Sequence, residues 1–215
     1  MIKLQKAILK TLSYADVFDY PLTLPELHQF LIGTKASIND LEKALTETKE
    51  VTQDGQFFFL KKRLKIVQIR QKRFRWSQNK LKIAKQVAKY LKLIPFIKMV
   101  AVTGNLAMDN AEQDDDIDLL IITAKKRLWL TRLLTNFLVE IVANRRRPGD
   151  QKVKDKICLN MFLDENHLKL PVKEQNLFIA HEVCQLKPLW TKNQLYQKFI
   201  QESLWCQNFL PNWKP

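Results

Sequence analysis

The chain has 215 residues, of which 46% are hydrophobic and only 4 are glycine, so it is long enough to form a sizeable core and is not of low complexity. No uncharged apolar run reaches the roughly 18 residues that a membrane span needs, and the N-terminal residues lack the apolar core of a signal peptide. The three cysteines are odd in number and widely spaced, which indicates reduced thiols. We therefore expect a cytoplasmic protein.

The net charge of +14 is distributed unevenly along the chain. Residues 1–60 carry six Lys and Arg against eight acids, residues 61–92 carry thirteen against none, and residues 93–215 carry seventeen against fourteen. These changes in composition predict three parts: a small N-terminal module, a basic helical connector, and a larger C-terminal domain that includes the last helices of the chain.

Residues 1–60 show the start and stop signals of three short helices and a hairpin. An apolar stripe over residues 2–14 predicts the first helix. Thr23, followed by Pro25 and Glu26, forms a capping box for the second, and Ser37 opens the third. Asp54-Gly55, between two β-prone runs, predicts a hairpin. This order resembles a winged helix-turn-helix domain.

The third helix of such a domain reads DNA, but residues 37–48 offer Lys43 against three acids. A groove-reading helix needs cations for the phosphates and donors for the base edges. The sequence therefore favours a module that packs or binds a protein partner over one that reads DNA.

Residues 61–92 contain neither Pro nor Gly and repeat apolar residues at helical spacing, which predicts one long amphipathic helix, or two in line. Its cations repel one another, and a bound polyanion such as RNA would relieve that repulsion. Lys72, Arg73 and Arg75 are the candidate contacts, with a merely solvated basic face as the alternative.

Residues 97–123 read as a buried strand, a turn at Gly104, a short helix and a second strand that begins at Asp116-Ile117-Asp118. Residues two apart on a strand share a face, so Asp116 and Asp118 project together and repel each other unless a cation lies between them. Paired carboxylate oxygens suit Mg²⁺ or Mn²⁺. A well-buried helix over residues 128–143 and a third strand at "KICLNMFLD" follow.

This arrangement resembles the nucleotidyltransferase superfamily (DNA polymerase beta-like, or minimal nucleotidyltransferase domains), in which Gly-Ser or Gly-Gly precedes Asp-x-Asp by about ten residues. Gly104-Asn105 and Asp116-Ile117-Asp118 match that signature. The resemblance implies a fold of the α+β or α/β class, with a mixed sheet flanked by helices. It also implies that Gly104 and Asn105 bind the phosphates of a nucleoside triphosphate such as ATP, and that Asp116 and Asp118 hold the metal.

The implied activity transfers a nucleoside monophosphate to an acceptor hydroxyl and releases pyrophosphate. The family's third carboxylate, on the next strand, has no obvious counterpart here. Strict alternation along this strand places Asn160 on the same face as Cys158, Phe162 and Asp164. Asn160 therefore stands where the family has its third carboxylate. Asp164 or Glu165 could substitute for that carboxylate from the end of the strand. The alternative function is therefore a non-catalytic regulator that senses nucleotide or binds nucleic acid through a degenerate transferase domain.

Overall fold

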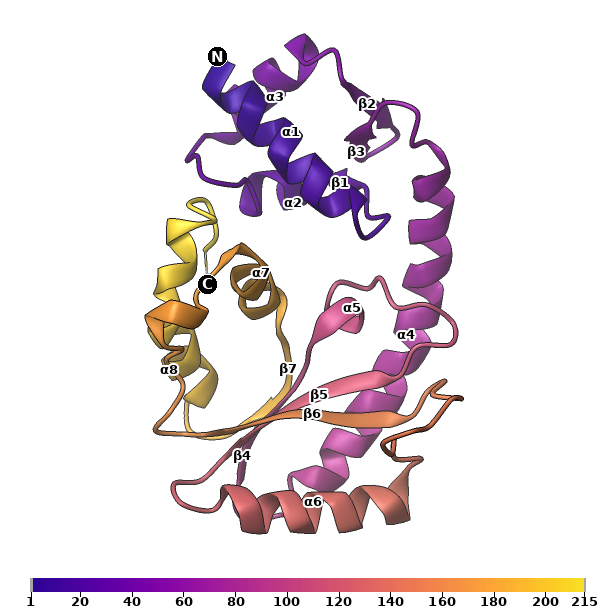
Figure 1. Ribbon diagram of the computed structural model, residues 1–215, viewed down its shortest axis with the longest axis vertical. Coiled ribbons are helices and arrows are strands. Elements are labelled where there is room, and N and C mark those ends of the chain that lie inside the picture. Colours follow the sequence, from indigo (N-terminus) through magenta and orange to yellow (C-terminus); the bar gives the residue numbers. More distant parts are fainter. Residues whose placement is uncertain (1, 215) are drawn as a thin grey trace. The chain divides into compact units, whose positions relative to one another are not determined.

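The computed structural model describes residues 2–214, which form two compact units (Figure 1). Unit 1 combines the N-terminal 72 residues with residues 175–184 and the chain from Trp205 onward. Unit 2 comprises Arg73–Glu174 and Gln185–Leu204. Each unit is therefore made of segments that are distant in the sequence.

The helices and strands follow one another along the chain as α1 (Ile2–Asp16), β1 (Leu22–Thr23), α2 (Leu24–Gln29), α3 (Ile38–Glu47), β2 (Val51–Asp54), β3 (Phe57–Leu60), α4 (Lys65–Leu91), β4 (Ile97–Val102), α5 (Gly104–Ala107), β5 (Ile117–Thr123), α6 (Leu128–Val142), β6 (Ile157–Asp164), α7 (Leu177–Gln185), β7 (Lys187–Thr191) and α8 (Leu195–Glu202). Short 3₁₀ turns lie at Val172–Glu174 and Leu204–Asn208. The single long basic helix is confirmed as α4.

The three helices and the hairpin of residues 1–60 are present in unit 1. Thr23 and Glu26 form the capping box of α2, and the Ser37 hydroxyl accepts from the Asp40 N–H at the start of α3. Strands β2 and β3 form the hairpin around Gly55, and β1 adds to β3 to give the order β1-β3-β2. The local signals therefore predicted these elements, while the winged-helix assignment stays a prediction.

The C-terminal segments are divided between the two units, which differs from the expectation that residues 93–215 form one domain. In unit 1 the Asn212 amide donates to the His28 carbonyl at 2.9 Å and accepts from the Ala36 N–H at 3.1 Å. The buried His181 ring, on α7, stacks on Tyr14 with 4.2 Å between centroids. Of the two C-terminal helices α7 and α8, α8 packs on the sheet of unit 2, against β4 and β7. Polar and aromatic contacts between segments far apart in the chain decide this division.

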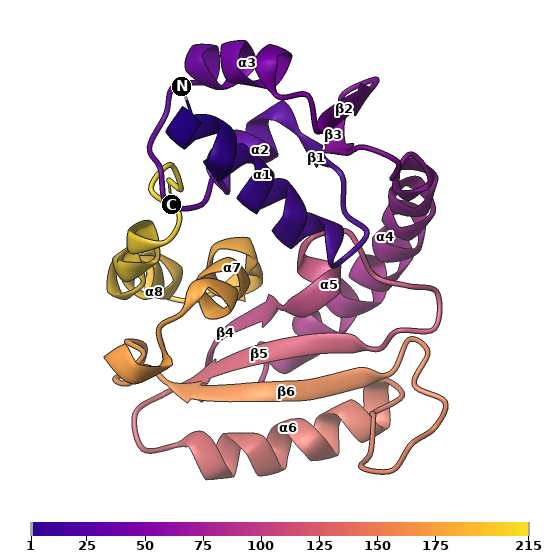
Figure 2. The same cartoon turned by 45° about the horizontal axis from the view of Figure 1, so that its top comes forward.

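Unit 2 contains a mixed four-stranded sheet with the order β6-β5-β4-β7, and Figure 2 labels β4, β5 and β6 of this sheet. Strands β5 and β6 are parallel, and the other two pairings are antiparallel. Strand β7 was not predicted from the sequence, which from residue 172 onward indicated two amphipathic helices. It contains Pro188 and is an edge strand, where proline is tolerated. The helices and the mixed sheet confirm the α+β class, consistent with a nucleotidyltransferase-like fold.

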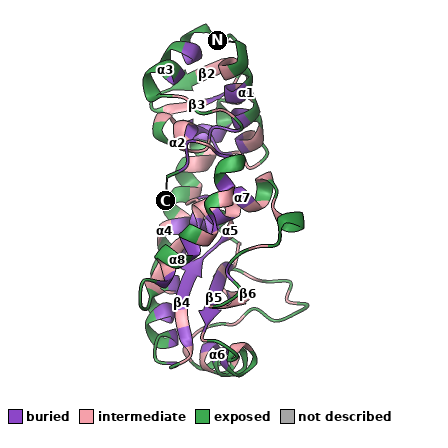
Figure 3. Cartoon of the chain, turned by 90° about the vertical axis from the view of Figure 1, so that its left-hand side faces the viewer, coloured by how far each residue is buried: buried purple, intermediate pink, exposed green. Residues whose placement is uncertain are grey.

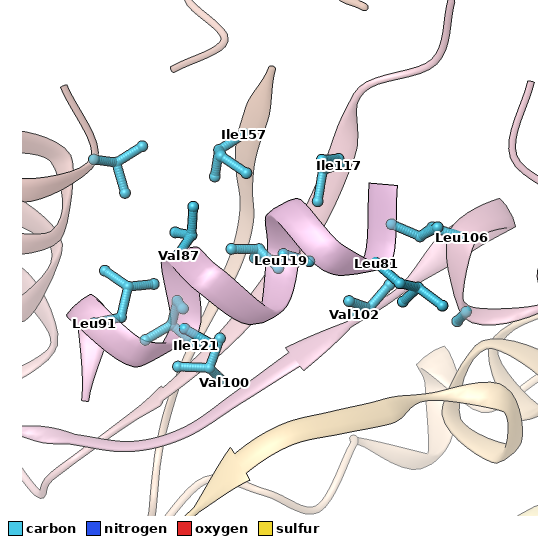
Figure 4. Packing of buried hydrophobic residues seen from close by; sticks show 14 of the residues in the cluster. Leu81, Val87, Leu91, Val100, Val102, Leu106, Ile117, Leu119, Ile121 and Ile157 are labelled. Carbon is cyan, nitrogen blue, oxygen red and sulfur yellow. The ribbon is translucent and has the colours of Figure 1, made fainter. Parts of the chain in front are cut away.

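The core of unit 2 lies between α4 and one face of the sheet (Figure 4). Leu81, Ala84, Ala88 and Leu91 recur at three- and four-residue spacing on α4 and pack on buried residues of β4, β5 and β6. Figure 3 shows β4 and β5 as buried along most of their length. This packing fixes α4 against the strands that carry the candidate site.

The polar side of α4 binds the segment that connects α5 to β5. The Lys80 side chain is 2% exposed, and its ammonium donates to the carbonyls of Gln113 (3.1 Å) and Asp115 (2.6 Å) and to the Asp155 carboxylate (2.8 Å). One turn earlier, the Ser77 hydroxyl accepts from the Ala111 N–H at 2.9 Å. A buried lysine therefore sets the path of the chain into β5.

We expect Lys80→Met to lower the free energy of unfolding by roughly 2–4 kcal/mol, because two backbone carbonyls and a carboxylate would lose their shared donor. Urea denaturation of the purified protein measures the loss. Lys85→Met, an exposed lysine on the same helix, is the matched control and should change stability by less than about 0.5 kcal/mol. Equal effects of the two substitutions would contradict the proposed role of Lys80.

Candidate functional site

The turn after β4 lies directly against the second aspartate of the Asp-x-Asp motif. Gly104 has φ +62°, a conformation that favours glycine, and the neighbouring Thr103 N–H donates to the Asp118 carbonyl at 3.2 Å. A Cβ placed on Gly104 would lie 3.4 Å from Asp118 Oδ2. Glycine is therefore favoured here by its backbone conformation, and it leaves the space beside the carboxylate open.

Asp116 and Asp118 converge at the start of β5, as their spacing predicted. Together with Cys158 on β6 they offer ligand atoms that lie within 4.8 Å of one another. Burial raises the pKa of Asp118, and the negative charge of Asp116 raises it further. Two carboxylates are thus held together in a partly desolvated place where a bound cation would relieve their repulsion.

A cation already lies at this acidic pair, and sequence analysis did not anticipate it. Arg146, from the loop between α6 and β6, donates to Asp116 Oδ2 at 2.5 Å and also contacts Cys158. A bridge between Arg145 and Ile157 fixes that loop beside the start of β6. The available signal was the run of three arginines directly before the Pro-Gly turn.

The residue beside the aspartates on β6 is Cys158, not Asn160. Asp118 pairs in register with Cys158, but Leu120 pairs with Met161, so β6 has one additional residue in between. This bulge interrupts the alternation that placed Asn160 and Phe162 on the face of Cys158: Asn160 is exposed, and Phe162 packs against the core. The assumed strand register was therefore wrong.

Asp164 and Glu165 do not replace the missing carboxylate either. Asp164 pairs with Thr123, five residues along β5 from Asp118, which corresponds to roughly 16 Å. Its carboxylate accepts from the Lys126 N–H at 2.8 Å, and Glu165 accepts from the Lys125 N–H at 3.0 Å. Both acids therefore bind the turn at the opposite end of the strand.

The remaining acids of the cluster have structural roles or face solvent. Asp115 accepts from the Glu112 N–H at 2.8 Å and so closes the turn before β5, while Asp114 is exposed. The Asn105 side chain is also exposed, one residue after Gly104. The structure thus brings Gly104, Asp116 and Asp118 together and places Asn105 next to them along the chain.

The three candidate polyanion contacts differ in their surroundings. Arg73 has a side chain that is 12% exposed, forms an ion pair with Glu112 and contacts Asn110. It therefore binds the segment before β5, and its role as a polyanion contact stays a prediction. Lys72 and Arg75 are exposed and stay candidates.

Burial of the cysteine suppresses its acidity. Desolvation, followed by the hydrogen bond to Asp118 and the charge of that carboxylate, raises the pKa of Cys158 to about 12. At neutral pH the residue is a thiol that donates to Asp118. It can accept neither a proton nor a hard metal ion in the way that a carboxylate would.

No family model matches the chain, and no curated protein matches it. Among solved structures, a chain from the crystal structure of a toxin-antitoxin with AMP-PNP superposes with a TM-score of 0.35 at 14% identity, over 56% of this chain and 83% of that one. A chain from a mutant of the toxin-antitoxin MntA-HpeT gives 0.34 at 14% identity, over 55% and 81%. Similarity at this level carries no weight for function.

We expect Asp118→Asn to stabilise the metal-free protein at pH 7, because it removes a desolvated charge beside Asp116. A carboxyl group whose pKa is raised by folding costs stability above its folded pKa and costs nothing below its unfolded pKa. The gain in melting temperature should therefore be present at neutral pH and disappear as the pH falls towards 4. An equal gain at both pH values would contradict the electrostatic cause.

Proposed function

We propose that the chain is a metal-dependent nucleotidyltransferase that transfers a nucleoside monophosphate from a nucleoside triphosphate to an acceptor hydroxyl. The observation that carries this proposal is the juxtaposition of three features at one end of β5: a left-handed glycine turn, a carboxylate that the turn touches, and a second carboxylate two residues earlier. A surface acid cluster would need neither the glycine nor the partial burial.

The residues present fit a hard divalent cation. Asp116 and Asp118 supply oxygen ligands of the kind that Mg²⁺ and Mn²⁺ bind, whereas the Cys158 thiol is a poor ligand for them. The Thr103 hydroxyl beside Gly104 is buried and has no hydrogen-bond partner among the described residues. When bound, the metal would offset the charge of the triphosphate and of the pyrophosphate that leaves.

The chain's own residues would then bind and orient the substrate. The open side of Gly104 lets a phosphate approach the backbone, and the exposed Asn105 amide can donate to it, as serine does in the family. Arg146 would exchange Asp116 for a phosphate oxygen when the metal binds, since a guanidinium pairs with either anion. None of these residues removes a proton from the acceptor.

The surroundings of Cys158 favour an anionic acceptor. A cavity of about 310 Å³ adjoins this residue, and its lining includes Arg132, Arg145, Arg146 and Arg147. Glu140 pairs with Arg145 and Arg147, which offsets part of their charge. Of the acceptors open from the sequence, namely an RNA end, a small molecule such as an aminoglycoside and a protein hydroxyl, the cationic lining disfavours the aminoglycoside and favours RNA.

The second candidate function is a nucleotide sensor without turnover. Two observations favour it: Cys158 stands beside the aspartates where a third carboxylate would supply a base, and Arg146 already neutralises Asp116. In this case unit 1 would be the module that responds to the bound nucleotide by binding a protein partner. Measurements of binding and of turnover separate the two candidates.

We expect Mg²⁺ and ATP together to raise the melting temperature, since a ligand that binds only the native state stabilises it, by about 2.7 kcal/mol at a concentration about 100 times its dissociation constant. Asp116→Asn and Asp118→Asn should each abolish the shift, measured relative to the same variant without ligand. Asp114→Asn, an exposed acid of the same loop, is the matched control and should keep it. An undiminished shift in both site variants would remove the metal assignment.

We expect wild-type turnover to be slow, because the thiol at residue 158 is protonated and a positioned base typically contributes about 10²- to 10⁴-fold. Cys158→Asp should raise the rate of pyrophosphate release from ATP with an RNA pool as acceptor. Asn160→Asp, which adds the same charge two residues further along β6, is the matched control and should not. Fast wild-type turnover that Cys158→Asp leaves unchanged would show that the base comes from elsewhere.

A further inference from the structure

Helix α6 exposes its more hydrophobic side to solvent. The residues that it buries best are Thr131, Thr135 and Val139, at four-residue spacing. Its exposed large apolar residues are Trp129 (77% exposed), Leu130 (40%), Leu133 (66%), Leu134 (36%), Phe137 (68%) and Ile141 (65%). The prediction of a well-buried helix was therefore wrong for this side, and the pattern is the reverse of an ordinary surface helix.

This arrangement is energetically unfavourable on both the buried and the exposed side of the helix. Inside, the Thr135 hydroxyl is buried and has no hydrogen-bond partner among the described residues. Outside, Trp129, Leu133, Phe137 and Ile141 form one row along the helix, with Leu130 and Leu134 beside it. A contiguous exposed apolar patch of this kind marks an interaction surface.

The charges around this patch are mostly positive. Residues 124–150 contain seven Lys and Arg against two acids. Lys125, Lys126 and Arg127 are exposed directly before the helix, and three arginines follow it. The whole chain carries +14, so a second copy would bring like charges together. The patch is therefore complementary to a surface that is apolar within and anionic at its rim.

The position of α6 suits a flat surface. Figures 1 and 2 both show α6 running along the outer side of β6, with no other described element of unit 2 beyond it. Figure 3 shows exposed residues along the same helix. The row from Trp129 to Ile141 spans about 18 Å at 1.5 Å per residue, so it can lie along an interface. No helix among residues 2–214 is long and apolar enough to cross a membrane.

We propose that α6 is a peripheral membrane-binding element that inserts Trp129, Leu133, Phe137 and Ile141 among the lipids of an anionic bilayer. The helix lies in the plane of the interface, and the exposed Lys125, Lys126 and Arg127 before it contact the lipid headgroups. Helices of this type combine aromatic and leucine side chains on one side with flanking cations. The proposal concerns a surface of unit 2 and does not depend on the proposed transferase activity.

The test is flotation of the purified full chain with vesicles of phosphatidylcholine alone or with about one third phosphatidylserine. We expect binding to the mixed vesicles, weak binding to the neutral ones, and a steep loss between low and high salt. Leu133→Ser with Phe137→Ser should lower affinity by about tenfold or more without lowering the melting temperature. Val17→Ser with Leu204→Ser, two other exposed apolar residues, is the matched control and should retain binding.

Two further measurements separate insertion from surface attraction. Lys125→Gln with Lys126→Gln should weaken binding to mixed vesicles more than Lys82→Gln with Lys85→Gln on α4, although both pairs remove the same charge. The fluorescence of the wild type should shift to shorter wavelength on binding, and Trp129→Phe should lose that shift while it still floats.

Three results would overturn the proposal. One is the absence of flotation at low salt, and another is equal binding by the Leu133→Ser, Phe137→Ser variant and the wild type. The third is a dimer of the wild type in sedimentation that the same two substitutions abolish, because that result assigns the patch to a second copy. Binding of neutral and anionic vesicles with the same affinity would contradict the role given to the flanking lysines.

Discussion

The buried ammonium of Lys80 is the contact on which the arrangement of unit 2 depends. It holds two successive parts of the segment before β5 and an aspartate of the segment before β6, and so joins α4 to both strands of the candidate site. The side chain is almost fully buried, so its charge is stabilised mainly by these three oxygens. The start of β5, where Asp116 and Asp118 converge, is therefore fixed by a helix that contributes none of the candidate ligands.

Ion pairs within the protein account for three of the nine Lys and Arg residues of α4. Lys80 and Arg73 bind the segment before β5, and Arg70 pairs with Glu26 inside unit 1 at 2.7 Å. Cations that appear unpaired in the sequence thus find their acids in other segments. The remaining exposed lysines and arginines of α4 keep a net positive face, which a polyanion would still neutralise.

The candidate site combines features of an active and of an inactive transferase. The glycine turn and the two carboxylates match the proposed binding of a metal and a triphosphate. Arg146 instead neutralises Asp116, and Cys158, whose pKa is raised, keeps its proton and cannot act as a base at neutral pH. Residue 158 is therefore the position at which the two proposed functions, enzyme and sensor, make different demands on the side chain.

The sequence by itself determined the local elements and the pair of aspartates. These features depend on interactions over a few residues, so short segments were enough to predict them. They are the capped helix starts, the hairpin at Asp54-Gly55 and the convergence of Asp116 and Asp118. Only the tertiary structure decided that Cys158 and not Asn160 lies beside the aspartates, because Cys158 pairs with Asp118 and the bulge that follows interrupts the alternation along β6. Contacts between distant segments also decided four other features. These are the ion pair of Arg146 with Asp116, the partners of Lys80, the edge strand with Pro188 and the exposed side of α6. Sequence periodicity shows that a helix has an apolar side, but only packing decides whether that side is buried.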